Sequence, residues 1–161
     1  MKPGKPVLWQ NLSWQDVAAL RDRGITMAIL PVGATEQHGP HLPLGVDTLS
    51  AEAVAKGASA LTGIPVLPSL AYGCSLGHSP KWPGTISLRP ETLSRLVLEI
   101  AEWLNSAGFD RLLLLNGHVE PVLFCLPPEG NDEWLVVVDT ASGKVNGDGG
   151  PRTIIAGVNF E

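Results

Sequence analysis

Two short runs of apolar residues constrain the fold of this chain most. MAILPV (27–32) and RLLLL (111–115) have the length and composition of strands that are buried on both faces of a sheet. IPVLPS (64–69) is a third candidate strand. Helix-like segments separate these runs, and this alternation predicts an α/β domain with a mostly parallel sheet.

Three segments carry helical signals. Residues 14–23 begin with a Ser-x-x-Asp capping box and end at a glycine. Residues 48–62 are rich in alanine and also end at a glycine. Residues 90–107 show the strongest pattern, because Pro90 suits the first turn and apolar residues recur at helical spacing. We predict a helix in each segment.

Composition and charge exclude several classes of protein. The 161 residues are 44% hydrophobic and 17% charged, as in globular proteins with one core. The net charge is -5 and the 11 basic residues are scattered, so no nucleic-acid or membrane surface is expected. The first residues lack the apolar core of a signal peptide, so we expect a cytoplasmic protein. Cys74 and Cys125 form no CxxC pair, which excludes a cysteine-based zinc knuckle.

Side chains that can bind metal ions follow two of the predicted strands. Glu36 and His38 come after the first strand, and His118 and Glu120 come after the third. Asp47 follows a loop that is rich in glycine and proline. Because the carboxyl ends of parallel strands meet at one edge of a sheet, these segments can converge on one crevice.

These two imidazoles and three carboxylates suit zinc or manganese, and they exceed what one tetrahedral ion needs. Two ions that share a carboxylate would use all five side chains, would lower the pKa of a bound water and would polarise a carbonyl group. The alternative is a loop whose acids cap helices and whose histidines hydrogen-bond to the backbone. Spacing alone does not separate the two interpretations.

Three ordered sequence blocks make the pattern more specific. LPVGATEQHGPHLPLGVDTL (30–49) resembles the signature of the creatininase (creatinine amidohydrolase) family. YGCSLGHS (72–79) with WPGTISL (82–88) is similar to the second block of that family, and LNGH (115–118) to the third. The blocks occur in the family's order between about residues 9 and 120, and the opening WQNLSWQDV is also similar.

The resemblance implies a three-layer α/β/α sandwich, a homo-oligomer that is commonly a hexamer, and two divalent ions, Zn²⁺ and/or Mn²⁺. It implies that Glu36, Asp47 and His118 bind one ion. His38, Asp47 and Glu120 would bind the other, so that Asp47 bridges the pair. Water activated by the ions would attack a small cyclic or linear amide, a C–N bond other than a peptide bond, and no side chain is assigned to catalysis.

The loop of the second block offers candidate substrate contacts. His78 and Trp82 are predicted to touch the small-molecule substrate; the alternatives are a solvated histidine and a tryptophan that packs under the loop. His41 either supports the metal ligands or hydrogen-bonds to the backbone, and the structural role is favoured. Ser75 and Ser79 have no His–Asp pair nearby, so no catalytic triad is predicted.

The resemblance ends near residue 120, where the chain reads NGHVEP and most family members read Asn-Gly-His-Gly-Gly-Asn. We therefore expect a creatininase-like metal-binding domain at 1–120, truncated relative to the family, and an atypical, poorly packed tail at 121–161.

Within this tail, WLVVVD (134–139) could add a strand at the sheet edge. Loss of one nucleotide from two glycine codons would produce Val119 and Glu120, so we favour a frameshifted tail over a divergent, shortened family member.

Two other functions stay open beside amide hydrolysis. One is a catalytically inactive remnant that keeps part of the metal site, because no histidine follows His118 and the family's later His-Ala-Gly block is absent. The other is a metal-dependent hydrolase of a non-amide ring substrate.

Overall fold

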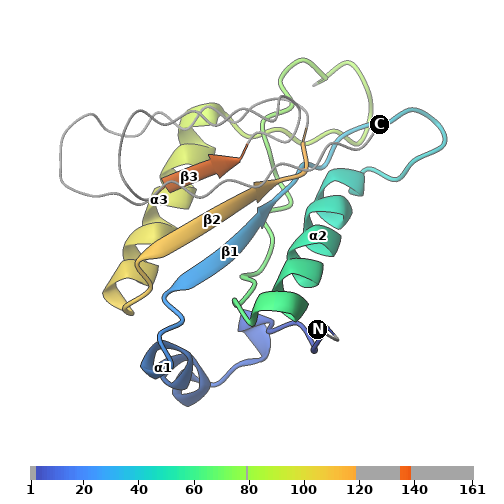
Figure 1. Cartoon of the computed structure of the whole chain (residues 1–161). Coiled ribbons are helices and arrows are strands. Elements are labelled where there is room, and N and C mark those ends of the chain that lie inside the picture. Colours follow the sequence, from blue (N-terminus) through green and yellow to red (C-terminus); the bar gives the residue numbers. More distant parts are fainter. Residues whose placement is uncertain (1–2, 79, 119–134, 139–161) are drawn as a thin grey trace.

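The computed structural model describes residues 3–78, 80–118 and 135–138 (Figure 1). Its elements in chain order are η1 (Trp9–Asn11), α1 (Trp14–Asp22), β1 (Met27–Val32), α2 (Val46–Thr62), α3 (Pro90–Ser106), β2 (Arg111–Asn116) and β3 (Leu135–Val138). The strands form a parallel sheet in the order β1-β2-β3. The predicted α/β class is therefore confirmed.

Helices cover both faces of this sheet, as its alternating side chains require (Figure 1). On β1, Leu30 packs into one apolar cluster with the buried face of α3, including Leu93 and Val97. Ile29 points to the opposite face and packs against Ala51 and other small residues of α2. The three layers place α2 on one side of the sheet and α1 with α3 on the other.

The segment predicted as a strand at 64–69 joins the sheet only through isolated bridges. Val66 pairs in parallel with Ile29, and Leu70 pairs with Val32. Proline has no backbone N–H, so Pro31 in β1 cannot donate to this segment, and the ladder between the two is interrupted there. A continuous strand was therefore a wrong prediction, although the segment does lie along the free edge of β1.

The predicted helices are confirmed with small shifts at their ends. Ser13 and Asp16 form the capping box at the start of α1, with the Ser13 amide 2.8 Å from the Asp16 carboxylate. α2 begins at Val46, two residues before the predicted start at 48. This shift matters for the site, because it places Asp47 in the first turn of a helix instead of in a loop.

The predicted edge strand in 134–139 is present as β3, which pairs in parallel with β2. The rest of the predicted tail lies outside the described residues. None of the described helices is long and apolar enough to cross a membrane.

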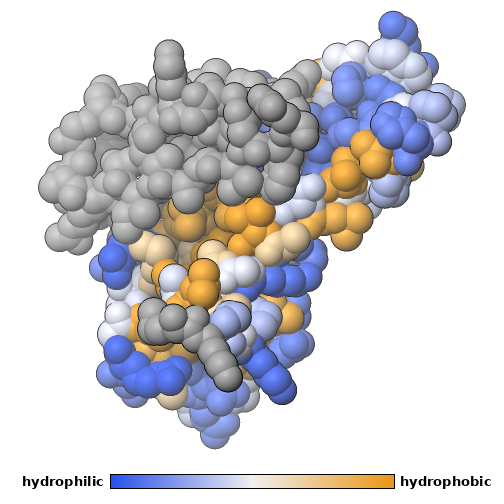
Figure 2. Space-filling model, turned by 45° about the vertical axis from the view of Figure 1, so that its right-hand side comes forward, coloured by the Kyte–Doolittle hydropathy of each residue, from blue (hydrophilic) through white to orange (hydrophobic). Residues whose placement is uncertain are grey.

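Hydrophobic residues gather in a band across the middle of one face of the molecule (Figure 2). Several large apolar side chains are exposed in the loops that follow the strands, among them Leu44, Leu76, Trp82 and Ile86. Exposed apolar surface can mark a contact site.

Candidate metal centre

The carboxyl ends of β1 and β2 meet the first turn of α2. Glu36 follows the end of β1, and His118 follows the end of β2. The Gly117 amide donates to the carbonyl of Val32 over 2.8 Å, which ties the two strand ends together. Asp47 reaches the same place from the start of α2. Three segments that are far apart in the sequence thus converge, as predicted.

Two glycines allow α2 to approach the strand ends this closely. A Cβ on Gly117 would lie 2.3 Å from the carbonyl oxygen of Asp47, and one on Gly33 would lie 2.4 Å from the Thr48 hydroxyl. Neither distance is possible for a real side chain, so both positions require glycine. The sequence interpretation did not give these glycines a role in the site; their position directly after a buried strand was the available signal.

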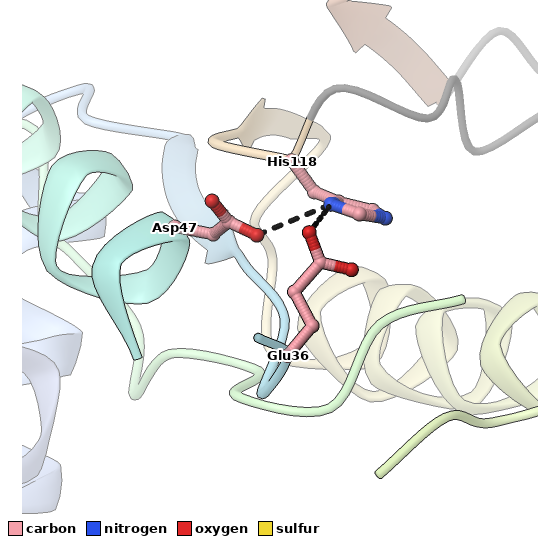
Figure 3. Close-up of side chains that lie close together, drawn as sticks. All are labelled: Glu36, Asp47 and His118. Carbon is pink, nitrogen blue, oxygen red and sulfur yellow. Dashed lines mark hydrogen bonds and ion pairs between the residues drawn. The ribbon is translucent and has the colours of Figure 1, made fainter. Parts of the chain in front are cut away.

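Glu36, Asp47 and His118 form a buried cluster (Figure 3). Their exposed fractions are 5%, 5% and 2%. His118 Nδ1 lies 3.1 Å from Asp47 Oδ2 and 3.3 Å from Glu36 Oε1. Two donors about 2.1 Å from one tetrahedral ion would be about 3.4 Å apart, so these separations fit ligands of a shared ion.

His38 approaches the cluster from the side of the other Asp47 oxygen. Its Nε2 atom lies 3.0 Å from Asp47 Oδ1 and 3.7 Å from Glu36 Oε1. The two oxygens of Asp47 therefore face two different histidines, with Oδ2 toward His118 and Oδ1 toward His38. A carboxylate placed in this way can join two ions, one on each oxygen.

Backbone carbonyls orient both histidine rings. His118 Nε2 donates to the carbonyl of Cys74 over 2.9 Å, and His38 Nδ1 donates to the carbonyl of Glu36 over 3.1 Å. In each ring the remaining nitrogen then faces Asp47. Histidine ligands of metals are usually held by such a hydrogen bond from the second nitrogen.

The Asn116 side chain fixes the backbone that carries His118. Its Nδ2 atom donates to the carbonyl of His118 over 2.9 Å, and its Oδ1 atom accepts from the amide of His118 over 3.1 Å. The roles of Asn116 and of the Cys74 carbonyl were missed in the sequence. The Asn-Gly-His block was a signal for the role of Asn116. The role of the Cys74 carbonyl could not be predicted, because a backbone acceptor can belong to any residue type.

The buried carboxylates of the cluster change the pKa of His118. Burial lowers the pKa of His118, but the hydrogen bond to Asp47, the charge of Glu36 and the Cys74 carbonyl together outweigh it. The pKa of His118 therefore lies above its ordinary value. The carboxylates of Asp47 and Glu36 that raise this pKa would also favour a divalent cation near Nδ1.

The other predicted site residues have different surroundings. His78 Nδ1 lies 3.3 Å from Glu36 Oε2, at the edge of the cluster. Trp82 packs edge-on against the His78 ring and also lies under the Lys81 ammonium group. His41 is exposed. Glu120 lies outside the described residues, so its predicted role stays a prediction.

The sequence model of the creatininase family, described as creatinine amidohydrolase, matches residues 10–129. The chain belongs to the creatininase family. The match continues beyond residue 120, where the resemblance was expected to end, and this shortens the part of the tail that lacks a counterpart in the family.

Three curated relatives have different names. Creatinine amidohydrolase of Pseudomonas putida is 39% identical over 132 residues, 80% of this chain and 50% of that protein. A mycofactocin precursor peptide peptidase of Mycolicibacterium smegmatis is 42% identical over 100 residues, 58% of this chain and 40% of that protein. The 3-dehydro-scyllo-inosose hydrolase of Thermotoga maritima is 34% identical over 112 residues, 70% of this chain and 36% of that protein. This creatininase-family chain thus spans half or less of the length of these relatives.

Solved creatininase structures share the fold. The structure named "Creatininase Mn" has a TM-score of 0.70 at 38% identity and covers 74% of this chain and 48% of its own. A mutant creatininase of the Zn-Zn type has a TM-score of 0.69 at 38% identity. The match covers 75% of this chain and 48% of the mutant creatininase chain. The likeness supports the three-layer arrangement, and both names include a metal that the sequence predicted.

Proposed function

We propose that this chain carries the metal centre of a divalent-metal-dependent amidohydrolase that cleaves a small cyclic or linear amide. The observation that carries the proposal is the placement of Asp47, whose two carboxylate oxygens face two histidines at 3.0 and 3.1 Å. Membership of the creatininase family supports the reaction class.

The donor set fits two ions that share Asp47. Glu36, Asp47 and His118 would hold one ion, since their donor atoms all lie within 4.8 Å of one another. His38 and Asp47 would hold the second, with Glu120 as the third proposed ligand. Zinc and manganese both accept this mixture of imidazole and carboxylate donors.

Bound ions would supply a water molecule of lowered pKa and would polarise the scissile carbonyl. The residues of the chain prepare the place for this chemistry. Glu36 and Asp47 concentrate negative charge in a buried position, and the carbonyls of Cys74 and Glu36 hold the two imidazoles in one orientation. Ligands that are fixed in advance need no reorganisation during the reaction.

His78 and Trp82 stand at the more exposed side of the cluster, with side chains about one third exposed. We propose that they also border the space in which a small substrate binds. The Trp82 ring offers an apolar surface for a planar group.

Metal content of the chain, purified without added metal, is the first test. We expect two Zn²⁺ or Mn²⁺ ions per chain by inductively coupled plasma mass spectrometry. Asp47→Ala should release both ions, whereas Gln37→Ala should keep them, because the Gln37 side chain accepts from the Gly39 amide instead of facing the cluster. Full metal retention in Asp47→Ala would refute the bridging role.

Hydrolysis of a panel of small cyclic and linear amides, with and without a chelator, then tests the reaction. Loss of turnover on chelation and its return with Zn²⁺ or Mn²⁺ are the expected results. Turnover that is insensitive to chelation would refute the proposal. Metal binding without turnover of any amide would favour the second candidate, an inactive metal-binding chain.

A third candidate is hydrolysis of a non-amide ring, and one relative gives it specific support, because it is a 3-dehydro-scyllo-inosose hydrolase. Including carbocyclic ketones in the panel separates this candidate from amide hydrolysis. We also propose a homo-oligomer, for which the exposed apolar loop residues are suitable. Sedimentation velocity of the full chain tests the assembly.

A further inference from the structure

The second carboxylate oxygen of Glu36 has no partner in the cluster itself. Oε1 lies beside His118, whereas Oε2 lies 3.3 Å from Nδ1 of His78. Both Oε2 and this Nδ1 are buried, and neither has a well-formed hydrogen bond among the described residues. The distance suits a hydrogen bond, but the direction is not aligned. Buried polar atoms in native proteins are nearly always satisfied, so the pair requires an explanation.

Contacts within the loop hold the His78 ring beside Glu36. Trp82 packs edge-on against it, with ring centroids 5.4 Å apart and an angle of 81° between the planes. The backbone of the same turn is hydrogen-bonded, from the His78 amide to the Ser75 carbonyl and from the Trp82 amide to the His78 carbonyl. The loop therefore holds Nδ1 close to Oε2.

The same loop holds a second member of the cluster. The Cys74 carbonyl accepts from Nε2 of His118, four residues before His78. Two hydrogen bonds anchor the base of the loop, from the Ser75 amide to the Ser87 hydroxyl at 2.7 Å and from the Leu88 amide to the Gly73 carbonyl at 2.9 Å. One loop thus contacts two of the three residues that are proposed to share an ion.

We propose that His78 is a positioning residue of the metal centre, whose Nδ1–H donates to Glu36 Oε2 and so keeps Oε1 directed at the ion. This inference rests on the proposed function, because it presumes that Glu36 binds metal. His78 acts through Glu36 and is not itself a ligand. Such supporting contacts typically change metal affinity by about 10–100-fold when they are removed.

Zn²⁺ affinity of the full chain, measured by competition with a chromophoric chelator, tests this role. The variants are His78→Ala, His78→Gln and His78→Asn, with His41→Ala as the matched control from an exposed position. An asparagine amide N–H takes the place of Nδ1–H, whereas a glutamine amide reaches the place of Nε2. We expect His78→Ala and His78→Gln to bind Zn²⁺ about 10–100-fold more weakly. His78→Asn should restore most of the affinity, and His41→Ala should match the wild type.

Co²⁺ substitution adds a readout of the ligands themselves. We expect the visible spectrum of Co²⁺-loaded His78→Asn to match that of the wild type, because no ligand is lost. Equal loss of affinity in all three His78 variants with a changed Co²⁺ spectrum would make His78 a direct ligand and overturn the proposal. Wild-type affinity in His78→Ala, or in His78→Gln if the alanine variant does not fold, would also overturn it. Wild-type chain that binds no Zn²⁺ would refute the proposed function, and this inference with it.

Discussion

Gly117→Ala should separate the strand ends from α2 and damage the metal centre without touching a donor atom. The new Cβ would lie 2.3 Å from the carbonyl oxygen of Asp47, where ordinary contact begins at 3.4 Å. The first turn of α2 must therefore move by about 1 Å, because protein interiors are close-packed and the facing atom is backbone. Overpacking of this kind costs about 1–3 kcal/mol of unfolding free energy.

For a chain of this size that loss lowers Tm by about 2–4 °C per kcal/mol, or by about 2–12 °C in total. The same shift moves Asp47 relative to His118, whereas metal ligands tolerate errors of only about 0.2 Å. We therefore expect Zn²⁺ affinity to fall by at least about tenfold. Differential scanning calorimetry of the metal-free chain and chelator competition measure the two effects.

Gly57→Ala is the matched control on the same helix. A Cβ at Gly57 meets no atom within 4 Å, so alanine fits there. Because glycine weakens a helix interior, this variant should gain about 0.5–1 kcal/mol of stability. Zn²⁺ affinity should stay unchanged. Equal stability and equal affinity in Gly117→Ala and wild type would refute the close-packing argument.

Two further predictions concern the core and the pH dependence. Leu93→Ala should cost about 2–5 kcal/mol of unfolding free energy in urea denaturation, since Leu93 is fully buried, whereas Leu96→Ala on the exposed side of α3 should cost much less. In the metal-free chain, the raised pKa of His118 gives stability that is fully present below its unfolded pKa, about 6.5, and is lost as pH rises through the folded pKa. The difference in unfolding free energy between wild type and His118→Gln should therefore shrink as pH rises. The Zn²⁺ affinity of the wild type should increase over the same pH range, because the ion competes with the proton for His118.

The elements that the sequence predicted best are those whose burial is uniform. All six residues of β1 are buried, so its apolar run matches its bounds at Met27–Val32. The segment at 64–69 was harder, because its own apolar residues do not show that Pro31, on the neighbouring strand, interrupts the ladder. The start of α2 was also displaced, since Gly45 precedes it and contributes no side-chain cap.

The proximity of Glu36, Asp47 and His118 could be predicted, because spacing and motif limit which residues can meet. Their arrangement could not. Which oxygen of Asp47 faces which histidine depends on how deeply α2 packs against the strand ends, and the Cys74 carbonyl has no signature in the sequence. The contact of His78 with Glu36 could not be predicted, because it depends on the fold of a loop that is 42 residues away in the chain.

In the proposed two-ion centre, Glu120 is the ligand on which the second ion depends. Glu36, Asp47 and His118 would supply three donors to one ion, but the second ion would have only His38 and the shared Asp47 without Glu120. If the carboxylate of Glu120 is a ligand, Glu120→Gln should lower the content from two ions per chain to one. If Val119 and Glu120 arose from a changed reading frame, the variant should hold as much metal as the wild type. Sequencing the gene across these codons is an independent check, and an intact frame together with an unchanged metal content would refute both explanations.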